Sequence, residues 1–244
     1  MVRASICLAT FNGEKFLDIQ LQSILGQLSV EDELVIVDDG SSDHTLDILK
    51  SYQDQRIKLF QNSRNKGVNE TFARAMSYAK GQYIFLSDQD DRWIEGRLDR
   101  MITALEPDQP GLVVSNYALI NEKGDMIGDG LAERLKAEDS DRSLRNILKV
   151  LRGNMNYYGC AMGFTREFRD IALPLPRSTE SHDLWFGIMG NALAKIVHLE
   201  QDTLEHRIHG NNASIISRPL HSKLLSRMSM VWQIIQAYKR RMSA

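Results

Sequence analysis

The chain lacks three features, and each absence excludes a class of protein. Only two of its 244 residues are cysteines, Cys7 and Cys160, so its stability does not depend on a disulfide framework and a reducing cytoplasm is favoured. No apolar run approaches the ~20 residues of a membrane-spanning helix, and the run at residues 4–9 is too short for a signal peptide. With 30 Lys and Arg against 32 Asp and Glu, the net charge is −2, which argues against nucleic-acid binding. We therefore expect a cytoplasmic protein that recognises phosphate only locally.

What the chain has instead is a regular alternation of strand-like and helix-like segments over its first 117 residues. Short apolar runs are typical of buried strands, and apolar residues at three- and four-residue spacing are typical of helices. We expect strands at residues 5–9, 34–37, 57–60, 83–86 and 112–115, and helices at residues 14–25, 43–52, 68–79 and 94–105. This alternation predicts an α/β fold in which helices flank a mostly parallel sheet.

The rest of the sequence is less regular. Glycines and charged residues between residues 107 and 141 predict a long loop or flap. The length fits one α/β domain with a smaller attached half. We expect a sheet half at residues 1–110, a second half at residues 111–216 and a tail at residues 217–244.

Polar clusters follow the predicted strands at the points where the strands end. In open α/β sheets, ligands bind beyond the carboxyl ends of the strands, so these clusters are candidates for a site. They occupy residues 10–13, 38–43, 62–67 and 87–91.

The last of these clusters contains Asp88, Asp90 and Asp91 within four residues. Crowded carboxylates raise one another's pKa values and cost stability unless a cation is shared. Their hard oxygen ligands suit Mg²⁺ or Mn²⁺, which keeps coordination positions free for diphosphate oxygens. The alternative is that Asp90 or Asp91 caps a helix entered at Trp93, and both roles can coexist.

The second cluster contains Asp39, which the tight turn around Gly40 does not explain. A carboxylate at this edge can accept a hydrogen bond from the imide N–H of a pyrimidine base, and Phe11 can stack beside the base. Either residue alone is weak evidence, because aspartates and aromatic residues are common in turns.

Two later motifs are candidates for catalysis. Asp183, in the pair His182-Asp183, can act as the general base that takes a proton from a hydroxyl acceptor. The alternative is that the pair only begins a helix. His209, beside Gly210, can be a ligand of a metal or a phosphate.

Taken together, these motifs closely resemble those of the family 2 glycosyltransferases. The resemblance rests on residues 9–13, 37–43, 65–67 and 87–93, whose order and spacing match over about the first 105 residues. The later motifs at residues 159–160, 182–183 and 207–211 resemble the bacterial rhamnosyltransferase-like branch, and that match is less specific. The resemblance implies a GT-A fold, in which a nucleotide-binding sheet half merges with an acceptor half.

The resemblance also implies a function. The protein is expected to be a metal-dependent, inverting glycosyltransferase that moves a sugar from a UDP- or dTDP-sugar to a hydroxyl acceptor. The expected acceptor is a glycan or a lipid-linked glycan of a bacterial surface polysaccharide such as O-antigen, capsule or lipopolysaccharide. The expected cofactor is Mn²⁺ or Mg²⁺.

Site residues carry over position by position from the same resemblance. The nucleotide is expected at Thr10, Phe11, Asn12, Glu14, Asp39, Lys66, Asp88 and Gln89, with Asp39 at the base and Asp88 at the ribose or the donor sugar. The donor sugar is expected at Gly159, Cys160 and His182, the metal at Asp90 and His209, and the catalytic base at Asp183. Many relatives carry Glu-Asp where this chain has His182-Asp183, which leaves the role of His182 open.

The tail carries a basic amphipathic pattern. Apolar residues recur at helical spacing at Leu224, Met228, Val231, Ile235 and Tyr238, and the segment 217–244 holds six Lys or Arg and no acid. Such a helix can lie peripherally on the inner face of an anionic membrane, or pack against the catalytic body or a partner subunit. The sequence leaves these alternatives and the oligomeric state open.

Two rival functions fit less well. A receiver-like signalling module also gathers aspartates around Mg²⁺, but its acid pair follows the first strand, whereas Asp38-Asp39 follows the second. A sugar nucleotidyltransferase needs a Gly-rich basic loop after the first strand to hold a triphosphate. Residues 10–13 do not form such a loop.

Overall fold

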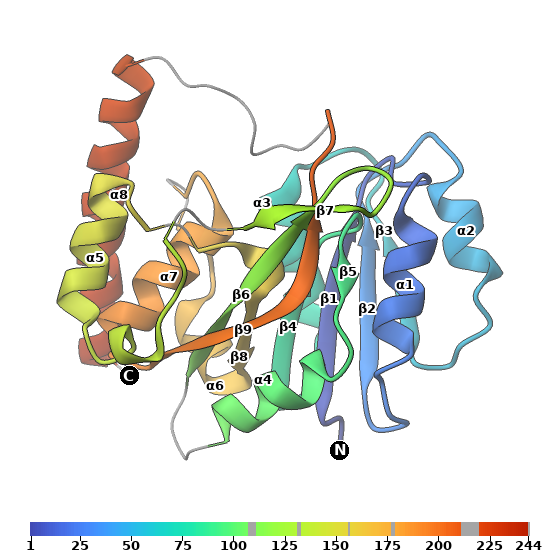
Figure 1. The fold of residues 1–244 in the computed structure, drawn as a ribbon, viewed down its shortest axis with the longest axis horizontal. Coiled ribbons are helices and arrows are strands. Elements are labelled where there is room, and N and C mark those ends of the chain that lie inside the picture. Colours follow the sequence, from blue (N-terminus) through green and yellow to red (C-terminus); the bar gives the residue numbers. More distant parts are fainter. Residues whose placement is uncertain (107–110, 131–132, 156, 177–178, 211–219, 244) are drawn as a thin grey trace.

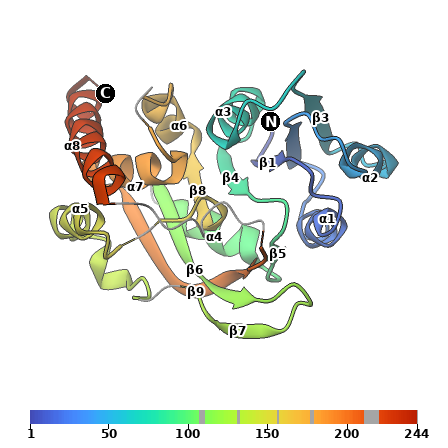
Figure 2. The same ribbon diagram turned by 90° about the horizontal axis from the view of Figure 1, so that it is seen from above.

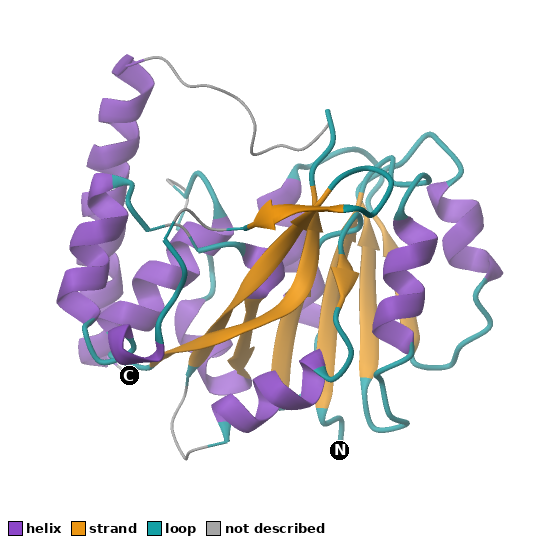
Figure 3. Cartoon of the chain, viewed as in Figure 1, coloured by secondary structure: helices purple, strands orange, loops and turns teal. Residues whose placement is uncertain are grey.

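The computed structural model describes residues 1–106, 111–130, 133–155, 157–176, 179–210 and 220–243, with the side chains of residues 220–225 and 243 left out. One twisted sheet runs through these residues, and helices flank it (Figure 3). Its strand order is β3-β2-β1-β4-β8-β6-β9-β5, with β7 paired to β6. Strands from both sides of residue 110 therefore share one sheet.

The first half of the chain builds the parallel part of the sheet. It comprises β1 (Ala4–Thr10), β2 (Glu33–Asp38), β3 (Ile57–Gln61) and β4 (Tyr83–Ser87), with α1 (Leu17–Leu25), α2 (Thr45–Ser51) and α3 (Val68–Tyr78) between them. Strand β2 and nearly all of β1 are buried, as expected for strands covered on both faces. The predicted elements of this half are confirmed to within a few residues, except that α1 begins three residues later than expected.

The second half adds strands of mixed direction. They are β6 (Leu112–Ile120), β7 (Met126–Asp129), β8 (Met162–Thr165) and β9 (Ile196–Arg207). Strand β8 runs antiparallel to both β4 and β6, and β6 runs parallel to β9. The predicted long loop is therefore wrong in part, because β6 extends to Ile120 and forms a hairpin with β7. The hairpin turns at Asn121, whose side chain accepts hydrogen bonds from the backbone of Lys123 and Asp125.

The helix predicted at residues 94–105 exists, but it begins later than expected and is not entered at Trp93. Residues Arg92–Trp93 form a short strand, β5, antiparallel to β9, and helix α4 (Arg97–Leu105) begins only after Gly96. Neither Asp90 nor Asp91 can therefore cap this helix, and another explanation is needed for both.

The remaining helices gather at the end of the molecule farthest from α2 (Figures 1 and 2). They are α5 (Ser143–Arg152), α6 (Arg166–Ala172), α7 (His182–Ala192) and α8 (Leu220–Ser243), and two 3₁₀ turns, η1 (Ala137–Asp139) and η2 (Gly159–Ala161), belong to the same half. In the two views, α3 and α6 lie on one face of the sheet and α1 and α4 on the other. The start of α3 is thereby brought toward the start of α7.

Helix α8 packs on α7 and also contacts α5 and α6. Gln233 and Ala237 are fully buried, and Arg240 donates hydrogen bonds to the carbonyl oxygens of Ile171 and Pro174. Of the predicted apolar stripe, Met228, Val231 and Ile235 are exposed, Tyr238 is half-buried and Leu224 is outside the described side chains. Among the described residues, no helix is long and apolar enough to span a membrane.

Candidate active site

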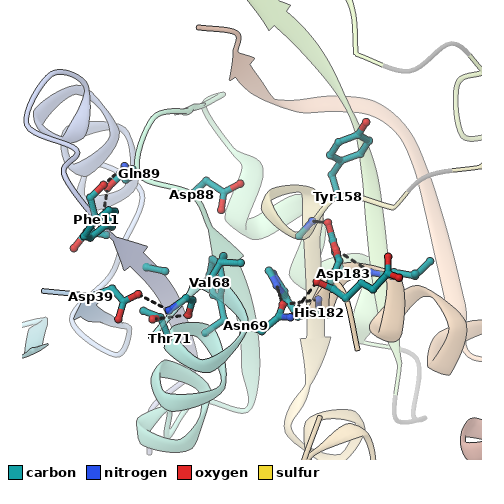
Figure 4. A pocket seen from close by; sticks show the side chains of 18 of the residues that line it. Phe11, Asp39, Val68, Asn69, Thr71, Asp88, Gln89, Tyr158, His182 and Asp183 are labelled. Carbon is teal, nitrogen blue, oxygen red and sulfur yellow. Dashed lines mark hydrogen bonds between the residues drawn. The ribbon is translucent and has the colours of Figure 1, made fainter. Parts of the chain in front are cut away.

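A pocket of about 760 Å³ opens at the carboxyl ends of β1, β2 and β4. The first turns of α3 and α7 and the segment 157–159 complete its wall, and Met230 of α8 also reaches it. Figure 4 shows Asp39 and Asp183 on opposite sides of this pocket, with Asp88 between them. The structure therefore brings together strand-end residues of the first half and loop residues of the second.

Asp39 is held rigidly at one side of the pocket. Its side chain is buried and accepts hydrogen bonds from Asn62 Nδ2 at 2.6 Å, from Lys66 N at 2.9 Å and from Gly67 N at 2.8 Å. Gly67 can aim its N–H at the carboxylate because its φ of 90° lies in the region that favours glycine. A carboxylate accepts about four hydrogen bonds, so Asp39 retains one acceptor position for a ligand. The Lys66 side chain points elsewhere and pairs with Glu70.

Phe11 and Gln89 form a clamp between the ends of β1 and β4. Gln89 Nε2 donates to the Phe11 carbonyl at 3.0 Å, and the Phe11 N–H donates to Gln89 Oε1 at 2.8 Å. Any side chain at Gly13 would collide with Gln89, because a Cβ there would lie 2.2 Å from Oε1. Both Phe11 and Gln89 line the pocket, but the Gln89 carboxamide already has both its groups engaged.

The other predicted nucleotide residues are placed differently from one another. Thr10 lines the pocket and donates its hydroxyl proton to Asp38. Asn12 and Glu14 do not line it, because their side chains accept hydrogen bonds from the backbone of Ser42 and His44. Their role is thus to brace the loop that follows β2.

Asp88 and Asp90 form the acidic centre of the pocket. Burial and the neighbouring carboxylates, including Asp183 for Asp88, raise the pKa of both groups. Asp90 Oδ2 lies 2.8 Å from His209 Nε2, which partly offsets this rise. The two predicted metal ligands are therefore in direct contact, although 119 residues separate them in the sequence.

Asp91 points away from the pocket and joins a buried cluster. Its Oδ1 accepts hydrogen bonds from His206 Nδ1 at 2.8 Å and from Arg207 N at 3.2 Å. Burial opposes the charge of His206, but the Asp91 carboxylate outweighs this effect and raises the pKa of His206 to about 9. Arg207 in turn donates through Nε to the Asp90 carbonyl at 3.0 Å. Residues 206 and 207, at the end of β9, thus hold Asp90 and Asp91 in place through hydrogen bonds.

Cys160 lies in the same buried cluster and does not line the pocket. Its Sγ is 3.9 Å from His206 Nδ1, so Asp91, Cys160 and His206 have the spacing of a metal site. A thiol binds metal as a thiolate, however, and burial raises the pKa of Cys160 well above its ordinary value. Since neither Asp91 nor Cys160 lines the pocket, we assign this cluster a supporting role.

The Asp90–His209 pair fits a divalent cation better. It offers a hard oxygen and an imidazole nitrogen, and its carboxylate lines the pocket beside Asp88. Burial and the neighbouring carboxylates raise the pKa of Asp88 and Asp90, and a cation beside them would favour their charged forms.

Asp183 stands at the first turn of α7, with His182 before it. The prediction of a helix N-terminus here is confirmed, and the same turn lines the pocket. The ring of His182 is buried, which lowers its pKa and keeps it neutral. Gly159 packs so closely that a Cβ there would lie 2.7 Å from His182 Nε2.

Sequence reasoning did not identify Tyr157, Tyr158 or His206 as pocket residues. Tyr157 and Tyr158 directly precede the predicted motif at residues 159–160, and His206 directly precedes the predicted motif at residues 207–211. Their position beside these motifs is the signal that could have identified them as pocket residues. The burial of His206 against Asp91 gave no signal, because 115 residues separate the two.

Comparison with known proteins accounts for this arrangement. Residues 5–171 match the family described as "Glycosyl transferase family 2". The chain belongs to glycosyltransferase family 2. This assignment decides against the receiver-like module and the nucleotidyltransferase, while the rhamnosyltransferase-like branch stays a prediction.

Two relatives illustrate the family. The Escherichia coli protein WfgD, named UDP-Glc:alpha-D-GlcNAc-diphosphoundecaprenol beta-1,3-glucosyltransferase, is 33% identical over 117 residues, which are 48% of this chain and 46% of WfgD. EpsH of Bacillus subtilis (strain 168), which carries a glycosyltransferase name, is 24% identical over 98% of this chain and 64% of its own length. The chain thus spans about half to two thirds of the length of these relatives.

A solved structure shows the same fold. TarS residues 1–349 of S. aureus, in complex with UDP-GlcNAc, superposes with a TM-score of 0.70 at 19% identity, over 96% of this chain and 66% of that one. The curled, mostly parallel sheet flanked by helices is therefore the GT-A fold, as predicted.

Proposed function

We propose that this protein is an inverting glycosyltransferase that transfers a sugar from a uridine or deoxythymidine diphosphate sugar to a hydroxyl group. The observation that carries the proposal is one pocket with a firmly held carboxylate, Asp39, on one side and a second carboxylate, Asp183, on the other. Between them, Asp88 and Asp90 line the same pocket and are the proposed neighbours of a diphosphate and its cation.

Asp39 and Phe11 are the proposed contacts of the nucleoside. The free acceptor position of Asp39 suits the imide N–H of a pyrimidine, and the half-exposed Phe11 ring offers a stacking surface. The clamp by Gln89 keeps the Phe11 backbone in place. Uridine is the first choice, because WfgD is named for UDP-Glc and TarS was solved with UDP-GlcNAc.

Asp183 is the proposed general base. It accepts the proton of the acceptor hydroxyl while the acceptor oxygen bonds to the anomeric carbon and the bond from that carbon to the diphosphate oxygen breaks. The attack occurs on the face opposite the leaving group, so one displacement inverts the anomeric configuration. His182, being neutral, places no positive charge beside the Asp183 carboxylate.

Asp90 and His209 would hold the Mn²⁺ or Mg²⁺ that glycosyltransferases of this kind use. When bound, such an ion supplies positive charge against the charge that develops on the departing nucleoside diphosphate. From the end of β9, Arg207 donates to the Asp90 carbonyl and His206 holds the neighbouring Asp91.

The proposed acceptor is a glycan or a lipid-linked glycan of a surface polysaccharide. The relative WfgD is named for such an acceptor, a sugar attached to diphosphoundecaprenol. In this chain, Tyr157, Tyr158 and Met230 provide the less polar wall of the pocket on the side of Asp183.

The test begins by finding the nucleotide and then removes the base. Thermal-shift screening of nucleoside diphosphates with Mn²⁺ identifies the base, and Asp183→Asn is then compared with wild type. We expect the nucleotide Kd to change by less than about twofold, while turnover falls about 100- to 10,000-fold, the usual loss on removing a general base. Asp47→Asn, a change at an exposed surface pair, is the control. Near-normal turnover in Asp183→Asn would remove this residue from the mechanism.

We also propose that the outer face of α8 rests on an anionic membrane, where lipid-linked acceptors lie. Exposed apolar side chains follow one another along this face at Met228, Val231, Trp232 and Ile235, and Lys239 lies over the Trp232 ring, 5.9 Å from its centroid. The segment 217–244 contains no acid, although Arg227, Arg240 and Arg241 donate to backbone carbonyl oxygens of the neighbouring helices. The protein would then be cytoplasmic and peripheral on the inner face of the cell membrane.

Vesicle flotation tests this placement. The double variant Val231→Glu/Ile235→Glu should lose binding to vesicles that contain phosphatidylglycerol, because two charges would enter the interface. Met126→Glu, at an exposed apolar residue of β7, should float as wild type does. Equal flotation of all three proteins, or none by wild type, would contradict membrane binding through α8.

A further inference from the structure

Asn69, in the first turn of α3, connects two parts of the pocket that are far apart in the sequence. Its Nδ2 donates to the carbonyl oxygens of Thr179 and Glu180, each at 3.2 Å. Its Oδ1 accepts from His182 N at 2.9 Å and lies 3.1 Å from His182 Nδ1. The side chain of Asn69 therefore contacts three of the four residues that directly precede Asp183.

These contacts fix the orientation of the amide and the tautomer of the histidine. A backbone N–H can only donate and a carbonyl oxygen can only accept, so Asn69 Oδ1 must face His182 and Nδ2 must face Thr179 and Glu180. His182 Nδ1 must then carry the proton that Oδ1 accepts. His182 Nε2 is consequently an unprotonated acceptor in contact with Gly159, and it has no hydrogen-bond partner among the described residues.

The same turn of α3 also holds the nucleoside side of the pocket. Lys66 N and Gly67 N, directly before the helix, donate to Asp39, and Thr71 Oγ1 donates back to the Gly67 carbonyl at 2.9 Å. Two residues after Gly67, Asn69 binds the segment that leads into α7. The short segment 66–69, at the start of α3, therefore contacts both Asp39, which is proposed to bind the nucleoside base, and the segment that carries Asp183, the proposed catalytic base (Figure 4).

The other contacts of this segment are weaker or more distant from Asp183. Gly159 N approaches Asp183 Oδ2 only at 3.4 Å, and Ser226 of α8 holds the Glu180 carboxylate, not the backbone. Asp183 Oδ1 accepts from the next residue, Leu184 N, which fixes its rotamer but not the place of the turn. Asn69 ties this turn to the first half of the chain through directional hydrogen bonds, and the His182 ring also packs on Phe72 of the same helix, with ring centroids 4.5 Å apart.

We propose that Asn69 is a positioning residue, which sets the place of Asp183 relative to a nucleotide held at Asp39. The proposal rests on the proposed function, because it assumes that Asp183 is the base. A displacement of about 1 Å in a reacting group can cost about 100-fold in rate, so the loss of Asn69 should lower turnover without loosening nucleotide binding.

Hydrogen exchange tests the positioning without any assay of activity. In Asn69→Ala, the backbone amides of residues 179–186 should exchange at least about tenfold faster, and the amides of residues 62–67 should exchange as in wild type. Ser77→Ala, at an exposed position in the last turn of α3, is the control and should change neither region. Unchanged exchange at residues 179–186 in Asn69→Ala would overturn the inference.

Kinetics separate positioning from a general loss of stability. For Asn69→Ala, kcat should fall about 10- to 100-fold while the donor KM and the nucleotide Kd stay within about twofold. The effects of Asn69→Ala and His182→Ala on kcat should be strongly non-additive, because Asn69 acts through the His182 turn. Additive effects, or parallel losses in kcat and nucleotide affinity, would overturn the inference.

A second variant keeps the test decisive if Asn69→Ala folds poorly. Asn69→Asp keeps the shape and both acceptor contacts with His182, but it replaces the two donors to Thr179 and Glu180 with an oxygen. It should also speed exchange at residues 179–186, and normal exchange there would overturn the inference. Failure of the wild-type protein to bind any nucleoside diphosphate would instead overturn the proposed function, and the exchange result would still stand.

Discussion

The three aspartates of one short motif, Asp88, Asp90 and Asp91, do not share one environment. Asp88 and Asp90 face the pocket, whereas Asp91 turns inward to His206 and Arg207. The sequence predicted their place at the end of a strand, because that depends on local pattern. The family resemblance predicted that Asp90 and His209 share a metal site, and the two side chains are in contact. No local pattern indicated that His206 pairs with Asp91, because 115 residues separate them. For Asp91, the sequence suggested a helix cap, and a buried ion pair proved to be its actual role.

The role proposed for Asp90 leads to a prediction about metal dependence. In Asp90→Ala, Mn²⁺ should no longer tighten the binding of the nucleoside diphosphate, because the hard oxygen ligand and its contact with His209 are gone. Titration calorimetry with and without Mn²⁺ measures this directly. Asp125→Asn, at an exposed aspartate of the β6–β7 turn, should keep the full effect of the metal. A metal effect that persists in Asp90→Ala would exclude Asp90 as a ligand.

Among the elements, β1 to β4 and the helices between them were predictable, whereas β5, β7 and β9 were not. Strands β1 to β4 are apolar, parallel and separated by amphipathic helices, so each had a local signal. Strand β5 has only two residues, and β9 contains polar residues throughout, with Glu200, Asp202 and Glu205 among them. Their pairing depends on contacts between distant strands, which a periodic pattern cannot reveal. The long loop predicted at residues 107–141 failed for this reason, since β7 is exposed and pairs only through β6.

The close packing of η2 on α7 predicts a specific effect at Gly159. In Gly159→Ala, the new methyl group would meet His182 Nε2 at 2.7 Å and Asp183 Cβ at 3.6 Å, so η2 or the start of α7 must shift. We expect kcat to fall about tenfold or more while the nucleotide Kd is unchanged, because the nucleoside side of the pocket is not touched. Steady-state kinetics and calorimetry together check this.

A matched control exists in the same fold. Gly67→Ala strains a residue with φ of 90° at the nucleoside side, where a Cβ would meet no other atom. It should weaken nucleotide binding first. The assignment of the two sides of the pocket would be contradicted if the two variants affected the same parameter.

At the scale of the whole molecule, one sheet gathers charge of opposite sign from the two halves of the chain. The first half supplies Asp88, Asp90 and Asp91, and the end of β9 supplies His206 and Arg207. Each half alone would bury uncompensated charge, which costs several kcal/mol. The carboxyl edge of the sheet therefore links folding to the assembly of the site, and this link should be visible in the pH dependence of stability.

The predicted pH dependence follows from His206. Burial disfavours its charged form, but Asp91 outweighs this and raises the pKa to about 9 in the folded protein, against about 6.5 in an unfolded chain. The folded state therefore binds the proton more tightly, so the stabilisation is complete below about pH 6.5 and is lost as the pH rises through 9. In thermal unfolding measured in EDTA from pH 6 to 10, Tm should fall most steeply between the two pKa values of His206, about 6.5 unfolded and about 9 folded. His206→Gln should lower Tm at pH 7 and flatten the slope, whereas His44→Gln, at an exposed histidine, should keep it. An unchanged slope in His206→Gln would show that the Asp91–His206 pair is not the group that titrates, because removal of the titrating histidine must remove its share of the proton linkage.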